Sequence, residues 1–164
     1  MASRADRHKG IPVPPVAMAA AVVLQRLAPK GRRARRLRRV VAVALAAGSG
    51  TLLLSTLGAF ARNGTTADPT APGNASVLVT GGSNGLSRNP MYLAVAGLLV
   101  AHAVERGSLP AWLPVGGFVL VMDRFQIARE EEALRNRFGE EYLQYCARTP
   151  RWLDRRSVDF TKRR

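Results

Sequence analysis

The feature that most constrains this chain is the segment 40–61, which is predominantly apolar and carries no charged residue. A membrane-spanning helix needs about 20 such residues, and this segment alone reaches that length comfortably. Three shorter apolar runs, at 11–24, 91–104 and 109–122, reach it only with their flanks, and each one singly also suits a buried core helix of a soluble protein. Four runs together favour a membrane protein, with spans predicted at 11–27, 40–61, 91–105 and 109–127. We therefore predict an all-α integral membrane protein with about four transmembrane helices plus a C-terminal amphipathic helix.

The remaining segments fit a single domain over residues 1–164. They are a cytosolic-side loop at 62–90, a C-terminal segment at 128–154 and a basic tail at 155–164. Residues 76–80 have the composition of a short strand, but the Gly-rich and Asn-rich surroundings favour a loop. The first apolar run resembles a signal peptide in length, yet it starts at prolines and lacks a small-x-small cleavage site, so we expect it to remain as a helix. A single cysteine, Cys146, excludes an internal disulfide and a cysteine-based metal cluster.

An arginine-rich loop is the strongest electrostatic feature of a chain whose net charge is +14. It holds eight basic residues and no acid: Arg26, Lys30, Arg32, Arg33, Arg35, Arg36, Arg38 and Arg39. Clustered arginines can bind nucleic acid, but no aromatic side chains stand among them to stack on bases. Because the loop lies between two apolar segments, we expect it to contact anionic lipid head groups and to influence topology.

The topology signals conflict. The positive-inside rule places the arginine-rich loop in the cytoplasm, and four spans then place the loop 62–90 and the C-terminal segment on the outer side. The basic residues of the two termini compete for the same compartment. We expect both termini on the cytosolic side, and the arginine-rich loop stays unreconciled with that orientation.

Two motifs flank the hairpin predicted at 91–127. The first is Arg88-Asn89-Pro90-Met91-Tyr92, in which Asn89 suits an N-cap and Pro90 the first turn of a helix. It is either a plain helix start or, with the Arg88 side chain and the free amides of that turn, a site for a carboxylate or phosphate.

The second motif starts at Glu130-Glu131-Glu132 and has Leu134, Phe138 and Tyr142 at intervals of four residues, which predicts one stripe along an amphipathic helix. The plainer alternative is a surface helix whose glutamates pair with Arg135 and Arg137. Tyr142, Tyr145 and Trp152 also suit an aromatic belt at the membrane interface.

Both motifs together resemble the isoprenylcysteine carboxyl methyltransferase and phospholipid methyltransferase superfamily. The matching elements are Arg88-Asn89-Pro90-Met91-Tyr92, Glu130-Glu131, Leu134, Phe138-Gly139, Tyr142, Tyr145 and Arg151-Trp152-Leu153, with weaker elements at Gly64-Thr65-Thr66-Ala67-Asp68-Pro69 and Leu78-Val79-Thr80. The resemblance implies a helical domain in the bacterial cytoplasmic membrane, with its active site facing the cytosol. It also implies S-adenosylmethionine as methyl donor and a membrane-embedded lipid or isoprenoid as acceptor.

The same resemblance assigns roles to individual residues. Catalytic residues would be Arg88, Asn89 and Glu131, and substrate-binding residues Arg88 and Arg151. The cofactor would be held by Asn89, Pro90, Tyr92, Glu130, Glu131, Tyr142 and Tyr145. Asn89 replaces the histidine of the isoprenylcysteine enzymes, and Gly82-Ser83-Asn84-Gly85-Leu86 stands where the family usually has Gly-Pro-Tyr-x-Tyr. His102 is expected to be a helix-packing hydrogen bonder.

The second functional interpretation is a membrane protein that kept the fold without catalysis. Such a protein would bind anionic lipid or a protein partner through the arginine-rich loop, and it would not bind S-adenosylmethionine. Oligomeric state has no signal in the sequence.

Overall fold

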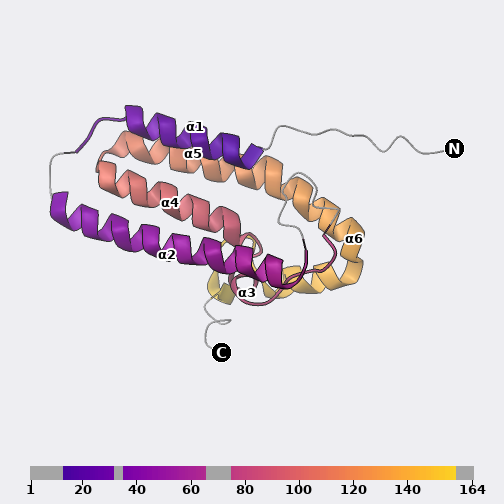
Figure 1. The fold of residues 1–164 in the computed structure, drawn as a ribbon. Coiled ribbons are helices and arrows are strands. Elements are labelled where there is room, and N and C mark those ends of the chain that lie inside the picture. Colours follow the sequence, from indigo (N-terminus) through magenta and orange to yellow (C-terminus); the bar gives the residue numbers. More distant parts are fainter. Residues whose placement is uncertain (1–12, 32–34, 66–74, 158–164) are drawn as a thin grey trace.

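Helices form all the regular structure in the computed structural model, which describes residues 13–31, 35–65 and 75–157 (Figure 1). They are α1 (Val13–Leu27), α2 (Arg35–Arg62), α3 (Ser83–Leu86), α4 (Pro90–Arg106), the 3₁₀ turn η2 (Leu109–Trp112), α5 (Leu113–Val121), the π-helical segment η3 (Met122–Gln126) and α6 (Ile127–Arg148). No strand forms in these ranges, and residues 76–80 are irregular. The all-α prediction is therefore confirmed. Pro12, Arg32, Arg33, the segment 66–69 and most of the basic tail lie outside the described residues.

Helices α1, α5, α4 and α2 lie side by side, with α2 along α4 and with α1 along α5 (Figure 1). The core between them is rich in alanine, and Ala94, Ala103 and Ala111 have no exposed surface. Small side chains let helix backbones approach closely. The alanines therefore let the helices pack closely, and Leu99, Phe118 and Met122 supply larger buried side chains.

Helices α2 and α4 approach each other closely at Ser49 and Gly97. A Cβ atom added to Gly97 would lie 2.2 Å from the Ser49 Oγ atom, well inside van der Waals distance. We expect Gly97→Ala to destabilise the protein by about 1–3 kcal/mol, because it overpacks this contact. Gly116→Ala on exposed α5 is the matched control, since nothing lies within 4 Å of its added Cβ and alanine favours a helix. Thermal denaturation of the two variants in detergent should shift the melting temperature in opposite directions, and equal shifts would contradict the contact.

One nearly continuous helix carries the chain out of the predicted hairpin. Segments α5, η3 and α6 follow one another without a break up to Gly139, which has φ 50° and ψ −121°. This kink turns the second half of α6 back beneath the bundle (Figure 1). The predicted stripe is thus wrong in its last step, because Phe138 and Tyr142 do not belong to one regular helix.

Much of the outer surface is apolar. Leu109, Leu113 and Leu27 are 86%, 76% and 76% exposed, and α2 carries further exposed leucines and valines. Among the described residues, α2 alone has the length and apolar composition of a membrane span, with a mean hydropathy of 1.9 over its best window. A core helix or a signal sequence can have the same composition. Four crossings therefore stay a prediction.

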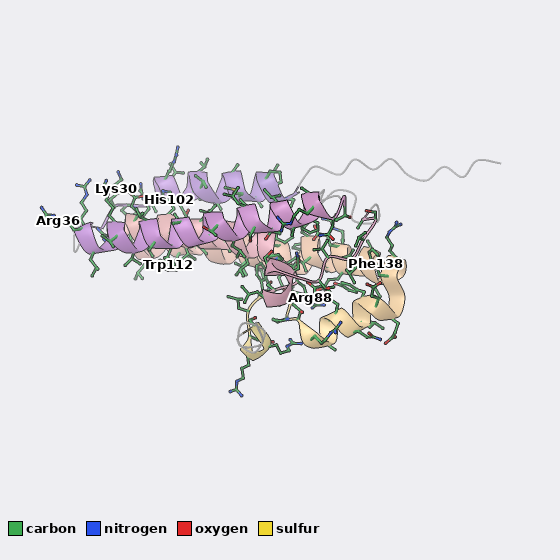
Figure 2. All side chains as sticks on the ribbon, turned by 60° about the horizontal axis from the view of Figure 1, so that its bottom comes forward. Lys30, Arg36, Arg88, His102, Trp112 and Phe138 are labelled. Atoms are coloured by element: carbon green, nitrogen blue, oxygen red, sulfur yellow. The ribbon has the colours of Figure 1, made fainter. Side chains whose placement is uncertain are left out.

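The two charged regions of the sequence occupy opposite ends of the bundle. Figure 2 shows Lys30, Arg36 and His102 toward one end, whereas Arg88 and Phe138 lie toward the other. The hairpin of α4 and α5 thus brings its two flanking motifs to the same end, as predicted. It also separates them from the arginine-rich loop by the length of the bundle.

Candidate functional site

A cavity lies where the start of α4 meets α6 and the irregular segment 75–79. It encloses about 120 Å³, or about 830 Å³ with the open space at its mouth. Its polar lining residues come from both predicted motifs and from α3, and they are Asn84, Arg88, Asn89, Tyr92, Glu130, Glu131, Tyr142 and Tyr145. Apolar side chains, including Phe60, Val77, Val79 and Leu134, complete it. Residues far apart in the sequence therefore form one concave surface of mixed character, as ligand sites commonly do.

Glu131 is the centre of an ion-pair network under this cavity. Its Oε1 atom lies 3.0 Å from the Arg88 Nη2 atom, and its Oε2 atom accepts a 2.5 Å bond from the Arg151 Nη2 atom. The side chain of Glu131 is 12% exposed and that of Arg88 is 14% exposed. Arg88 also contacts the sulfur of Cys146. The surface-helix alternative requires the glutamates to pair with Arg135 and Arg137. Glu131 instead pairs with Arg88 and Arg151.

Glu130 faces the same cavity in a different environment. Its Oε1 atom accepts hydrogen bonds from the Tyr92 hydroxyl at 2.5 Å and from the Gln126 side chain at 2.7 Å. Burial raises the pKa of the Glu130 carboxyl above its usual value of 4.5, and these two donors oppose the shift. The two adjacent carboxylates therefore have different partners, since Glu131 forms ion pairs with two arginines, whereas Glu130 accepts hydrogen bonds from neutral side chains.

The Arg88-to-Tyr92 motif forms the helix start that the sequence predicts. Pro90 occupies the first turn of α4, and Asn89 is the N-cap residue without a capping hydrogen bond from its side chain. Instead, the Asn89 amide donates to the Arg151 carbonyl at 3.0 Å. The N-cap position of Asn89 is confirmed, and its side chain connects the cavity to the C-terminal segment.

Two tyrosines line the cavity from the second half of α6. Tyr142 and Tyr145 are buried, with ring centroids 6.2 Å apart in an edge-on arrangement. Burial raises the pKa of both hydroxyls, so they stay neutral donors. The Tyr145 hydroxyl donates to the Asn84 carbonyl at 2.6 Å, which fixes α3 against α6.

Arg151 supports the cavity from behind and does not line it. Besides Glu131, its guanidinium contacts the Asp123 carboxylate at 3.1 Å, which also accepts a bond from the Trp152 indole at 2.9 Å. Hydrogen bonding to Glu131 raises the pKa of Arg151. The substrate-binding role assigned to Arg151 has no support from its position, because both of its carboxylate partners are internal.

The donors in the cavity are not all paired. The Asn84 Nδ2 and Arg88 Nε atoms are buried and have no hydrogen-bond partner in the described part of the chain. Buried donors of this kind are costly unless a ligand or water pairs them. S-adenosylmethionine carries a sulfonium cation, an amino group, a carboxylate and ribose hydroxyls. The lining fits this set, since Glu130 offers an anion, Asn84 and Arg88 offer donors, and the apolar side chains exclude water.

Sequence reasoning missed three polar residues of this region. Asp123 and Gln126 precede Glu130 by seven and four positions, so a search for polar side chains on one helical face would have found them. Asn84 lies within the loop predicted at 62–90. The segment 82–86, which stands where the methyltransferase superfamily usually has Gly-Pro-Tyr-x-Tyr, therefore contributes Asn84 to the cavity lining.

An uncharacterized protein of Haemophilus influenzae is 46% identical over 63 residues, which are 38% of this chain and the whole of that relative. The two proteins belong to one family. Because the relative's description names no activity, this family assigns no function to the cavity. No family model matches the chain. No solved structure matches it either.

Proposed function

We propose that this protein is an S-adenosylmethionine-dependent methyltransferase that acts on a lipid-like or isoprenoid acceptor embedded in the membrane. One observation carries the proposal. The two motifs that resemble the membrane methyltransferases, from Arg88 to Tyr92 and from Glu130 to Tyr145, line one cavity although about 40 residues separate them. One site formed by both motifs is what the resemblance implies.

The membrane part of the proposal rests on the exposed apolar surface and on α2. A monomeric soluble protein rarely exposes contiguous apolar patches larger than a few hundred Å². Here leucines and valines are exposed along several helices, and contact with lipid chains would remove them from water. We propose four crossings of the bacterial cytoplasmic membrane, with the cavity at the cytosolic end, so that an apolar acceptor reaches it from the bilayer.

The chain's residues bind and orient more than they transfer protons. When bound, S-adenosylmethionine would supply a methyl group that is attached to a positive sulfur. The acceptor would attack the methyl carbon in line, and the sulfur would leave as a neutral thioether. Glu130 complements the positive charge, and Asn84 and Arg88 have donors for polar groups. The apolar lining excludes water, and the Glu131 network holds Arg88 in place. For an amine or hydroxyl acceptor, Glu130 is also the candidate proton acceptor, because its raised pKa suits that role.

Binding of S-adenosylmethionine to the full chain in detergent, measured by calorimetry, tests the proposal directly. We expect saturable micromolar binding to the wild type. No binding in several detergents and lipid nanodiscs would overturn the enzyme proposal and favour the lipid-binding alternative. Transfer of a labelled methyl group to extracted membrane lipids would then identify the acceptor class.

Asn84→Ala gives a sharper test, because it separates binding from stability. Its unpaired Nδ2 atom stabilises nothing in the described residues, so its removal should leave the melting temperature unchanged or raise it. The affinity for S-adenosylmethionine should fall by about fivefold to tenfold, since one hydrogen bond to the ligand is lost. Tyr145 pairs with the Asn84 carbonyl of the main chain and is unaffected by the change. A variant that melts earlier and binds normally would contradict this role.

A further inference from the structure

A second cavity lies at the other end of the bundle, away from the candidate site. It is formed by the end of α1, residues Lys30 and Gly31, the start of α2 and the end of α4, and its volume is about 680 Å³. We call it the basic pocket. Its lining contains one acid, Glu105, beside His102 and six cations, which are Arg26, Lys30, Arg35, Arg38, Arg39 and Arg106.

The base of the basic pocket is ordered by main-chain contacts. The Arg38 guanidinium donates to the carbonyls of Gly31 at 2.8 Å and Arg106 at 3.4 Å, and the Gly31 amide donates to the same Arg106 carbonyl at 2.8 Å. Gly107 ends α4 with φ 63°, and a Cβ atom there would lie 1.0 Å from the Arg38 Nη1 atom. Glycine is therefore required at position 107, because any larger residue would occupy the space of the Arg38 guanidinium. The arginine is built into the fold and does not simply extend into solvent.

Several donors at this end lack acceptors. The Nε atoms of Arg38 and Arg106 and the hydroxyl of Ser108 are buried without a partner in the described ranges. His102, by contrast, is paired through its Nδ1 atom with the Gln25 side chain at 2.9 Å, so it belongs to the packing of the bundle, as the sequence predicts. Glu105 alone cannot balance six cations. The pocket thus has an excess of positive charge and of unsatisfied donors.

We propose that the basic pocket binds a phosphate group. Guanidinium groups match the tetrahedral oxygens of phosphate with several directed hydrogen bonds, and a phosphate would balance the charge that Glu105 leaves uncompensated. The group can come from an anionic lipid or from a free phosphate. Leu27 and Leu109 are highly exposed and are the sequence neighbours of the pocket-lining Arg26 and of Ser108. Their exposure favours a lipid whose chains lie along them. The proposal is independent of methyl transfer, because this pocket and the candidate site share no residue.

The test uses the full chain in a maltoside detergent and two probes. Native mass spectrometry would measure binding of phosphatidylglycerol against phosphatidylcholine, and calorimetry would measure binding of inorganic pyrophosphate. We expect saturable binding of phosphatidylglycerol in preference to phosphatidylcholine. Pyrophosphate binding of similar strength would identify free phosphate as the source, whereas weak pyrophosphate binding would identify the lipid. The absence of saturable binding by both phosphatidylglycerol and pyrophosphate would overturn the proposal.

The double variant Arg35→Gln, Arg39→Gln ties the binding to this pocket. Both side chains are exposed, and neither takes part in the hydrogen bonds that order the base, so the fold should be retained. We expect the affinity for the bound probe to fall by about tenfold or more. The matched control, Arg135→Gln with Arg155→Gln, removes the same charge from exposed positions outside the pocket and should leave binding unchanged. Equal losses in the two variants, or no loss in either, would mean general charge attraction and would overturn the assignment.

Discussion

Replacement of Glu131 by alanine should cause the largest loss of stability in this protein. Glu131 is the shared partner of Arg88 and Arg151, and its removal leaves the Arg88 guanidinium poorly hydrated and without an anion. Loss of one member of a buried ion pair costs about 3 kcal/mol or more, because the remaining charge is uncompensated. A clear fall in the melting temperature of the detergent-purified chain is the expected result. Binding of S-adenosylmethionine should also be lost, since Arg88 is no longer held at the cavity.

The neighbouring acid supplies the control for this experiment. Glu132 is exposed on the same helix, so Glu132→Ala should change the free energy of unfolding by less than about 0.5 kcal/mol. Its melting temperature should therefore stay close to that of the wild type. Glu131→Gln keeps one acceptor oxygen and should lie between the two. If Glu131→Ala melted at the same temperature as Glu132→Ala, the network under the cavity would have no structural importance.

Replacement of Glu130 by glutamine should have the largest effect on ligand binding. A charge-assisted contact to the cationic cofactor is worth roughly 1.5–3 kcal/mol, so the affinity should fall by about tenfold to a hundredfold. Stability should not fall, because glutamine also accepts hydrogen bonds from Tyr92 and Gln126. Calorimetry combined with thermal denaturation distinguishes this outcome from a folding defect. Normal affinity in the variant would remove Glu130 from the cofactor site.

The pH dependence of Glu130 gives the same test a second readout. Burial raises the pKa of this carboxyl above 4.5, so the neutral form persists to higher pH than in an ordinary glutamate. Affinity for a cation should therefore fall as the pH drops through this raised pKa, and the Glu130→Gln variant should lack that step. In the absence of ligand, the stability of the protein depends on pH in the opposite direction to the affinity. The contribution of Glu130 to stability is complete below the unfolded pKa and is lost as the pH rises through the folded pKa.

The helical architecture was predictable because each helix has local signals. The apolar run 40–61 lies within α2, and the span predicted at 91–105 nearly coincides with α4, which starts at Pro90 and ends before Gly107. The hairpin itself implied that residues on either side of it would meet. That expectation placed Arg88 and Glu131 at one end, and the structure joins them directly.

The rest of the site depends on contacts that leave no periodic signal. Arg151 reaches Glu131 only because Gly139 adopts a positive φ and turns α6 back under the bundle. Asn84 acquires its place from the Tyr145 contact, which spans 61 positions. A stripe drawn at intervals of four assumes a regular helix, and it therefore failed at the kink between Phe138 and Tyr142.

The hydrogen bonds between residues 150–157 and residues 86–88 have a consequence for the synthesis of the protein. Main-chain groups of Pro150 and Arg151 accept bonds from the Arg88 amide and the Ser87 hydroxyl, and Ser157 donates to the Leu86 carbonyl. Since synthesis proceeds from the N-terminus, α2 and α4 can pair while the ribosome is still adding α6. The cavity can close only after residue 157 has been released from the exit tunnel. Nascent chains arrested before that point would hold a paired bundle and an open, incompetent pocket.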